Sequence, residues 1–144
     1  MNRRFILIAE DDADDRYLMK TAFEETGITE DVAYVENGVE VLNYLESIKV
    51  ENGDQHFPKF ILLDLNMPKM DGREVLKKIK SNDLYRKIPV IVFSTTKNQM
   101  EVKRCYDLGA NTYVVKPVSY DTLVETIRVI CSYWFNTATL IDPI

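Results

Sequence analysis

The sequence predicts an α/β protein with a doubly wound parallel sheet, and three observations support that prediction. Short apolar segments alternate five times with segments whose apolar residues have helical spacing. The segment at residues 60–63 is apolar at every position, which is typical of a central parallel strand buried on both faces. Strict alternation of strand and helix places helices on both faces of such a sheet.

The first part of the chain holds two strand–helix units. Residues 5–9 form the first predicted strand, an acidic cluster follows it, and the next helix ends at Gly27. Residues 32–35 form a short second strand. The polar connection at residues 49–58 is longer than such loops usually are. The helix before it has an apolar face formed by Val41, Leu42, Leu45 and Ile48.

The rest of the chain holds three more units. After the strand at residues 60–63, a third helix is marked by Val75, Leu76 and Ile79. A fourth strand covers residues 88–93, and the helix after it runs to about Leu108, where Gly109 supplies the C-terminal stop. The fifth strand covers residues 112–115. The last helix has one apolar stripe, formed by Leu123, Ile127, Ile130 and Trp134.

Composition limits the classes of function. The chain has 144 residues, of which 46% are apolar, and this is enough for one globular domain spanning residues 1–144. The net charge is −5 and basic residues do not cluster, so we expect neither nucleic-acid nor membrane binding. Cys105 and Cys131 lack metal-ligand spacing, and the apolar residues before Glu10 are too few for a signal peptide. These features predict a cytoplasmic protein with reduced thiols.

Reactive side chains stand at the ends of four predicted strands. Glu10 and Asp11 follow the first strand, Asp64 the third, Ser94 the fourth and Lys116 the fifth. Because the carboxyl ends of parallel strands share one edge of the sheet, we expect these side chains to lie in one shallow cleft. Three clustered carboxylates repel one another unless a cation joins them, and oxygen ligands suit Mg²⁺.

Such a cleft has the groups that phosphoryl transfer to a carboxylate needs. A carboxylate can attack phosphorus and form an acyl phosphate. A metal ion and a lysine ammonium can neutralise the phosphoryl oxygens, while a hydroxyl donates to one of them. Asp64 as the nucleophile, with Glu10, Asp11, Lys116 and Ser94 around it, meets these needs.

These motifs resemble those of the receiver domain of the response-regulator (CheY-like) family. The resemblance covers about residues 4–131, and the motifs stand at four strand ends in the family's order. It implies a flavodoxin-like sheet of five parallel strands, in the order 2-1-3-4-5, flanked by five helices. The matching positions are the acidic pair Glu10 and Asp11, the phosphoacceptor segment at residues 64–72, the hydroxyl residue Ser94, the aromatic switch residue Tyr113, and the pair Lys116 and Pro117.

The resemblance also implies a role for each residue at the metal. Asp64 would be the phosphorylated residue and a metal ligand, and Asp11 would bind Mg²⁺ directly. Glu10 would act mainly through water, and Asn66 through its backbone carbonyl.

Three further residues receive roles by the same resemblance. Lys116 would pair with the acceptor carboxylate or the phosphoryl group, and its bond to Pro117 is expected to be cis. Ser94 would move toward the phosphoryl group while Tyr113 turns inward. These movements would reshape the face formed by the fourth helix, the fifth strand and the fifth helix.

The resemblance implies a stand-alone response regulator of a two-component phosphorelay rather than an enzyme. It would accept its phosphoryl group from a sensor histidine kinase and catalyse only its own phosphorylation and dephosphorylation. The connection at residues 49–58 and the extension at residues 132–144 are similar to the small regulators that serve bacteriophytochromes and other hybrid kinases. No output domain is expected after the extension, so the signal would leave by contact with a downstream protein.

The C-terminal extension also predicts a homodimer. Trp134 continues the apolar stripe of the last helix by one turn, and its neighbours Tyr133 and Phe135 flank it at angles that one core does not cover together. The alternative is that the tail folds back over its own helix. Further apolar surface comes from Leu140, Ile141 and Ile144.

Two other classes of function are weighed against this one. An enzyme or cofactor binder on the same scaffold, such as a flavodoxin-like protein or an aspartate-based phosphohydrolase, is disfavoured because no Gly-rich loop follows the first strand. Asp64 is also followed by Leu65 and Asn66 rather than by a second aspartate two positions on. A pseudo-receiver, acting as an interaction module without phosphorylation, usually lacks the acceptor, the acidic pair or the lysine, and all of these are present.

Overall fold

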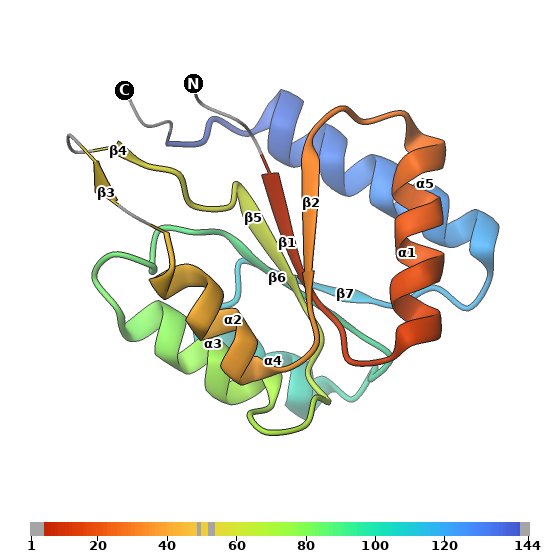
Figure 1. The fold of residues 1–144 in the computed structure, drawn as a ribbon. Coiled ribbons are helices and arrows are strands. Elements are labelled where there is room, and N and C mark those ends of the chain that lie inside the picture. Colours follow the sequence, from red (N-terminus) through yellow and green to blue (C-terminus); the bar gives the residue numbers. More distant parts are fainter. Residues whose placement is uncertain (1–4, 49, 52–53, 142–144) are drawn as a thin grey trace.

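A computed structural model describes residues 5–48, 50–51 and 54–141, and the predicted parallel sheet lies at its centre (Figure 1). The strands pair in parallel in the order β2-β1-β5-β6-β7. Counted along the chain within this sheet, the order is 2-1-3-4-5, so the predicted topology is confirmed. The strands are β1 (Phe5–Ala9), β2 (Asp31–Val35), β5 (Phe60–Leu63), β6 (Val90–Ser94) and β7 (Thr112–Val115).

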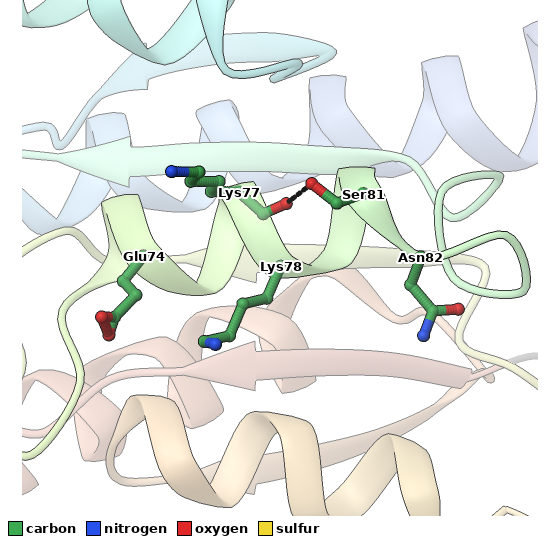
Figure 2. Close-up of a pocket in the computed structure, with 5 residues that line it drawn as sticks. All are labelled: Glu74, Lys77, Lys78, Ser81 and Asn82. Carbon is green, nitrogen blue, oxygen red and sulfur yellow. Dashed lines mark hydrogen bonds between the residues drawn. The ribbon is translucent and has the colours of Figure 1, made fainter.

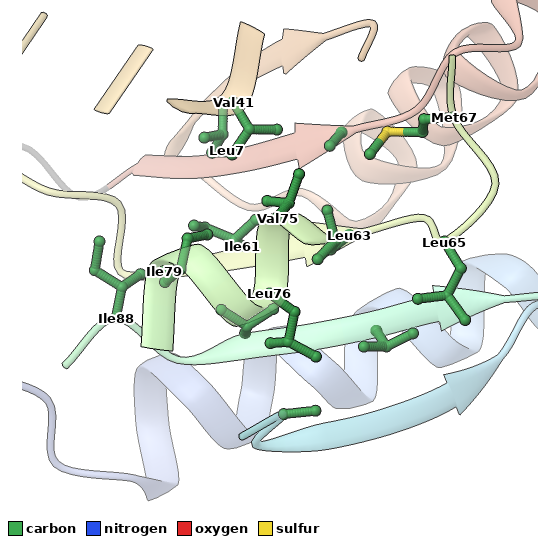
Figure 3. Packing of buried hydrophobic residues seen from close by; sticks show 14 of the residues in the cluster. Leu7, Val41, Ile61, Leu63, Leu65, Met67, Val75, Leu76, Ile79 and Ile88 are labelled. Atoms are coloured by element: carbon green, nitrogen blue, oxygen red, sulfur yellow. The ribbon is translucent and has the colours of Figure 1, made fainter. Parts of the chain in front are cut away.

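Helices cover both faces of this sheet, as predicted. One face carries α1 and α5, and the other carries α2, α3 and α4 (Figure 1). Because successive side chains of a strand point to opposite faces, Ile61 and Leu63 belong to the core under α2 and α3 (Figure 3), whereas Phe60 and Leu62 belong to the other core. The helices are α1 (Ala13–Thr26), α2 (Gly38–Glu46), α3 (Gly72–Ser81), α4 (Gln99–Asp107) and α5 (Tyr120–Cys131).

Each of these helices begins after a polar residue whose side chain caps it. Such a side chain accepts hydrogen bonds from N–H groups of the first turn, which have no partner within the helix. The caps therefore fix where each strand-to-helix loop turns into its helix. The capping residues are Asp12, Asn37, Asp71, Asn98 and Ser119.

The connection between α2 and β5 contains a hairpin where the sequence predicted a polar loop. The short strands β3 (Val50–Glu51) and β4 (Asp54–Gln55) pair in antiparallel fashion. Residues 49, 52 and 53 lie outside the described part of the chain. Backbone hydrogen bonds hold this pair, so a segment without an apolar pattern still forms strands.

The C-terminal end also departs from the predicted stripe. After α5 the chain continues as a π-helical segment, η1 (Ser132–Thr137). The rings of Trp134 and Phe135 pack against the ring of Phe60, with centroids 6.4 and 5.4 Å away. The Nζ atom of Lys59 donates to the carbonyl of Ile141 at 3.4 Å. The described part of the extension therefore folds back over its own sheet, and Ile144 lies outside the described residues.

Within the residues that the structure describes, no helix has both the length and the apolar character needed to cross a membrane.

Candidate functional site

The carboxyl edge of the sheet brings together the side chains that the sequence placed at strand ends. Glu10 follows β1, Asp64 follows β5, Ser94 ends β6 and Lys116 follows β7. Carboxylate oxygens of Glu10, Asp11 and Asp64 lie within 4.8 Å of one another. Glu10 and Asp64 are only 2% and 8% exposed, whereas Asp11 is exposed. The cluster therefore meets solvent at Asp11.

Lys116 lies among these carboxylates. Its ammonium donates a hydrogen bond to Oε1 of Glu10. The same Nζ atom lies 3.5 Å from Oδ2 of Asp64 and 3.9 Å from Oδ2 of Asp15. One positive charge thus faces three carboxylates, and it offsets only part of their repulsion.

Burial and charge act in opposite directions on the two partners of this hydrogen bond. Burial raises the pKa of Glu10 to about 7, and the opposing effect of Lys116 does not cancel that rise. Burial acts to lower the pKa of Lys116, but the hydrogen bond to Glu10 and the charge of Asp64 outweigh it, so that pKa is raised. The lysine is therefore charged at neutral pH, and a further cation beside Glu10 would favour the charged form of that carboxylate.

The donor set fits a hard divalent cation. Carboxylate oxygens from three residues converge on one point, and such ligands suit Mg²⁺ or a similar ion. A bound cation would also remove the repulsion that Lys116 leaves uncompensated. Asn66 lies two residues after Asp64 in the loop that follows β5, and its side chain is exposed.

A tight loop fixes the backbone next to Asp64. The N–H of Gly72 donates to the carbonyl of Leu65 at 2.8 Å, which closes the loop on itself. A Cβ atom at Gly72 would lie 2.2 Å from the carbonyl oxygen of Asp64, a distance that real Cβ atoms do not reach. Glycine is therefore required at position 72 because the backbone of Asp64 passes too close for a side chain, and not because the position needs a positive φ angle.

Comparison with known proteins identifies the family of this chain. The family model of the response regulator receiver domain matches residues 6–128. The chain belongs to this family. It is 37% identical over 131 residues to the probable methanogenesis regulatory protein FilR2 of Methanothrix harundinacea, covering 91% of this chain and 83% of that protein. It is 35% identical over 138 residues to response regulator Rcp1 of a Synechocystis species, covering 95% of this chain and 92% of Rcp1.

Solved structures of receiver proteins have the same fold. The phosphorylated cyanobacterial phytochrome response regulator RcpA superposes with a TM-score of 0.86 at 36% identity, covering 97% of this chain and 99% of RcpA. The Mn²⁺-bound form of Rcp1 superposes with a TM-score of 0.83 at 34% identity, covering 96% and 99% of the two chains. The protein is thus a CheY-like receiver of two-component signalling.

In this receiver domain, Ser94 and Tyr113 meet at the backbone of Thr96. The Ser94 side chain is fully buried, and its hydroxyl oxygen accepts from the N–H of Thr96 at 3.3 Å. The hydroxyl of Tyr113 donates to the carbonyl of Thr96 at 2.8 Å, and the ring packs against the core beneath α4. Tyr113 therefore already lies inward, in contact with the loop between β6 and α4.

The bond between Lys116 and Pro117 corrects one prediction. No peptide bond among the described residues is cis, so this bond is trans and the expected cis geometry is wrong here. The two isomers of a bond before proline differ by only about 0.5–1 kcal/mol, so the motif alone does not fix the isomer. Lys116 reaches Glu10 and Asp64 with the trans bond.

Two hollows of the surface differ in their relation to this site. One of about 300 Å³ borders it, and its lining combines Lys116 and Asp15 with apolar residues such as Leu18 and Phe93. The other, of about 380 Å³, lies along the outer side of α3 and shares no residue with the carboxylate cluster (Figure 2). Only the first hollow is therefore part of the receiver site. The second is lined by Glu74, Lys77, Lys78, Ser81 and Asn82.

Reasoning from the sequence missed the part played by Arg16. Its Nη1 atom donates to the carbonyl of Glu10 at 2.8 Å, and its Nη2 atom lies 3.2 Å from Oε1 of Glu36. Arg16 therefore links the start of α1 to the ends of β1 and β2. The available signal was one basic residue in a first turn that is otherwise acidic.

Proposed function

We propose that this protein is a stand-alone response regulator that accepts a phosphoryl group from a histidine kinase onto Asp64. One observation carries the proposal: the carboxylates of Glu10, Asp11 and Asp64 converge within 4.8 Å, with the Lys116 ammonium 3.5 Å from Asp64. A cluster of this kind is costly in a protein that has no use for it, because like charges in a partly buried site repel strongly.

The reaction is a transfer between two proteins. An oxygen of the Asp64 carboxylate forms a bond to phosphorus, while the bond between phosphorus and the imidazole nitrogen of the kinase breaks. The imidazole keeps the electron pair and takes up a proton. The product is an acyl phosphate on Asp64, and this regulator catalyses only that transfer and its later hydrolysis.

The surrounding residues prepare the acceptor. Lys116 supplies a charged ammonium that can turn from Glu10 toward a phosphoryl oxygen. Ser94 supplies a hydroxyl at the end of β6 that can donate to another phosphoryl oxygen once it leaves the N–H of Thr96. The hydroxyl of Tyr113 is bound to the carbonyl of Thr96 in the same loop, so a movement of Ser94 would be transmitted to the Tyr113 ring.

The metal in this proposal is Mg²⁺, held by Asp11, Asp64 and the backbone carbonyl of Asn66, with Glu10 acting through water. Bound there, it would neutralise charge on the phosphoryl oxygens during transfer. The hard oxygen ligands support this assignment. The Mn²⁺-bound form of the relative Rcp1 supports a divalent ion at such a site.

The partners follow from the relatives and from the exposed face. RcpA is named as a phytochrome response regulator, so we propose a sensor kinase of the bacteriophytochrome or hybrid type as the donor. Signal output would pass by protein contact through the face of α4, β7 and α5. Three exposed apolar side chains on or beside these elements support that role: Met100, Tyr106 and Val118. Two copies would also associate through α5 and the C-terminal segment.

The acceptor assignment is tested by substitution of Asp64. Intact-mass spectrometry of the protein treated with acetyl phosphate should show one added phosphoryl group, only when Mg²⁺ is present. Asp64→Asn should abolish it, because an amide nitrogen is a poor nucleophile toward phosphorus. Asp83→Asn, an exposed change outside the site, serves as the matched control and should label normally. Unchanged labelling of Asp64→Asn would contradict the assignment.

A further inference from the structure

α4 is held to the sheet by fewer buried side chains than its neighbours. Cys105 is the one buried residue among the nine of α4, all of which are described. In contrast, α1, α2, α3 and α5 each bury three or more residues. Since packing of an apolar face supplies most of the stability of a short helix, the position of α4 depends more on its polar contacts.

One of these polar contacts joins α4 to α3. The Nε atom of Arg73, at the start of α3, donates to Oε2 of Glu101 in the first turn of α4 at 2.7 Å. The two side chains are 19% and 30% exposed. The ion pair between Lys103 and Asp107 within α4 is 78% and 63% exposed. The Arg73–Glu101 pair is thus much better shielded, and shielded charge-assisted bonds are the stronger ones.

The Arg73 end of this pair is fixed to the acceptor loop. Arg73 directly follows Gly72, whose N–H is bonded to the carbonyl of Leu65, the residue after Asp64. The backbone of Gly72 also lies against that of Asp64, too close for any side chain at this position. A shift of the backbone in the Asp64 loop would therefore also shift Arg73.

The Glu101 end is fixed to the switch residues. α4 directly follows the loop that contains Thr96, whose carbonyl and N–H bind the hydroxyls of Tyr113 and Ser94. The hydroxyl of Tyr106 in α4 accepts from the N–H of Tyr113 at 3.0 Å. Tyr113 is therefore bound at its backbone by α4 and at its hydroxyl by the loop before α4.

Both charges of the pair act on the Tyr113 hydroxyl. Burial raises the pKa of Tyr113, its hydrogen bond with Ser94 opposes that rise, and the charges of Glu101 and Arg73 act on it in opposite directions. The Arg73–Glu101 pair thus forms one connected group with Tyr113 and Ser94, between the acceptor loop and α4.

We propose that Arg73 and Glu101 are positioning residues that hold α4 and the Thr96 loop where Tyr113 stays inward, beside Ser94. This rests on the proposed phosphorylation of Asp64, to which the inward arrangement of Tyr113 is coupled. Without the pair, α4 loses this hydrogen bond to α3, and Tyr113 turns outward for part of the time. Phosphorylation then slows because fewer molecules are in the competent arrangement.

The test compares single variants with a charge exchange. Arg73→Gln and Glu101→Gln each break the pair, and the double variant Arg73→Glu with Glu101→Arg restores it with the charges reversed. Lys103→Gln breaks the exposed pair of the same helix and is the matched control. The full chain is labelled with 3-fluorotyrosine, and the Tyr113 resonance is assigned through Tyr113→Phe. Two quantities are measured: that ¹⁹F resonance and the rate of phosphorylation by acetyl phosphate with Mg²⁺.

Both single variants should move the Tyr113 resonance toward that of free fluorotyrosine and slow phosphorylation by about two- to thirtyfold. The charge exchange should recover both quantities, and Lys103→Gln should leave both unchanged. If one single variant fails to fold, the other single variant and the charge exchange still test the pair. An unmoved resonance in the folded variants would overturn the proposal. If the parent protein takes no phosphoryl group, the proposed function fails, whereas the resonance still decides the role of the pair.

Discussion

The Nζ atom of Lys116 lies 3.5 Å from Oδ2 of Asp64, while the hydrogen bond of the same ammonium goes to Glu10. Lys116 thus acts on the acceptor through its charge and donates its hydrogen bond to the other buried carboxylate, Glu10. In this arrangement the acceptor oxygen is not tied up in a strong hydrogen bond and keeps its nucleophilic character.

Removing the Lys116 ammonium should show how much its charge contributes to the free energy of unfolding. Lys116→Met keeps an apolar stem but leaves Glu10 and Asp64 facing each other without compensation. We expect the free energy of unfolding without divalent ions at pH 8 to fall by about 3 kcal/mol, as for one partner of a buried ion pair. Urea unfolding measures this change. Lys103→Met, at an exposed pair, should change stability very little. An equal loss in both variants would contradict the buried role of Lys116.

The raised pKa of Glu10 predicts how stability depends on pH without metal. The folded protein keeps a proton on Glu10 up to about pH 7, whereas the unfolded chain releases it near the ordinary value of 4.5. Between these values the folded state binds more protons, so the free energy of unfolding should fall as the pH rises. The total decline should be about 3 kcal/mol, and it should end near pH 7.

Urea unfolding in EDTA between pH 4.5 and 8 measures that decline. The difference between the parent and Glu10→Gln isolates the contribution of Glu10, because all other groups titrate in both. A constant difference across this range would show that Glu10 titrates normally. Saturating Mg²⁺ should abolish the decline, since a bound cation stabilises the charged carboxylate.

Most of the fold could be predicted from the sequence because local patterns and burial agree. The four residues of β5 are apolar and all four are buried, as a central parallel strand requires. The polar residues at the strand ends share one edge because parallel topology leaves no other arrangement for Glu10, Asp64 and Lys116.

The features that were missed depend on contacts between distant residues or on small energy differences. The Arg73–Glu101 bond joins residues 28 positions apart and requires the packing of α3 beside α4, which no local pattern encodes. The π-helical segment η1 places Trp134 and Phe135 against Phe60, another residue distant in the sequence. The trans bond at Pro117 reflects a preference too small for a motif to fix.

Mg²⁺ binding should distinguish two neighbouring aspartates of equal charge. Asp11 contributes an oxygen to the carboxylate cluster, whereas Asp14 lies in the first turn of α1 and takes no part in it. Asp11→Ala should weaken Mg²⁺ affinity by at least about tenfold, as expected when an interaction at a metal site is lost. Asp14→Ala should leave the affinity nearly unchanged. Calorimetric titration with Mg²⁺ compares the two, and equal affinities would contradict the ligand assignment.

Gly72→Ala tests the close approach of the acceptor loop. The new Cβ would meet the carbonyl of Asp64 at 2.2 Å, so the loop must shift. We expect a loss of about 1–3 kcal/mol in unfolding free energy, the usual cost of overpacking, and slower phosphorylation of Asp64. Glu74→Ala, an exposed change in the same helix, should affect neither quantity. Normal phosphorylation of Gly72→Ala would show that the position of this loop is not critical.

In the C-terminal segment, different side chains should serve packing against the domain itself and association of two copies. Trp134 packs against Phe60 within one chain, so Trp134→Ala should lower the free energy of unfolding by about 2 kcal/mol.

Val129 and Tyr133 are 59% and 51% exposed on the same part of the chain, and we expect these two side chains to form the contact between the subunits of a homodimer. Sedimentation should show weaker association for Val129→Ser with Tyr133→Ser. Stability should fall only by the loss of the edge-on contact between the Tyr133 and Trp134 rings, about 0.5–1.5 kcal/mol. Phosphorylation of Asp64 should shift the dimer affinity by about 1–3 kcal/mol, the usual range for coupled sites. If the parent and this double variant both sediment as monomers with and without phosphorylation, the segment serves the packing of its own domain alone.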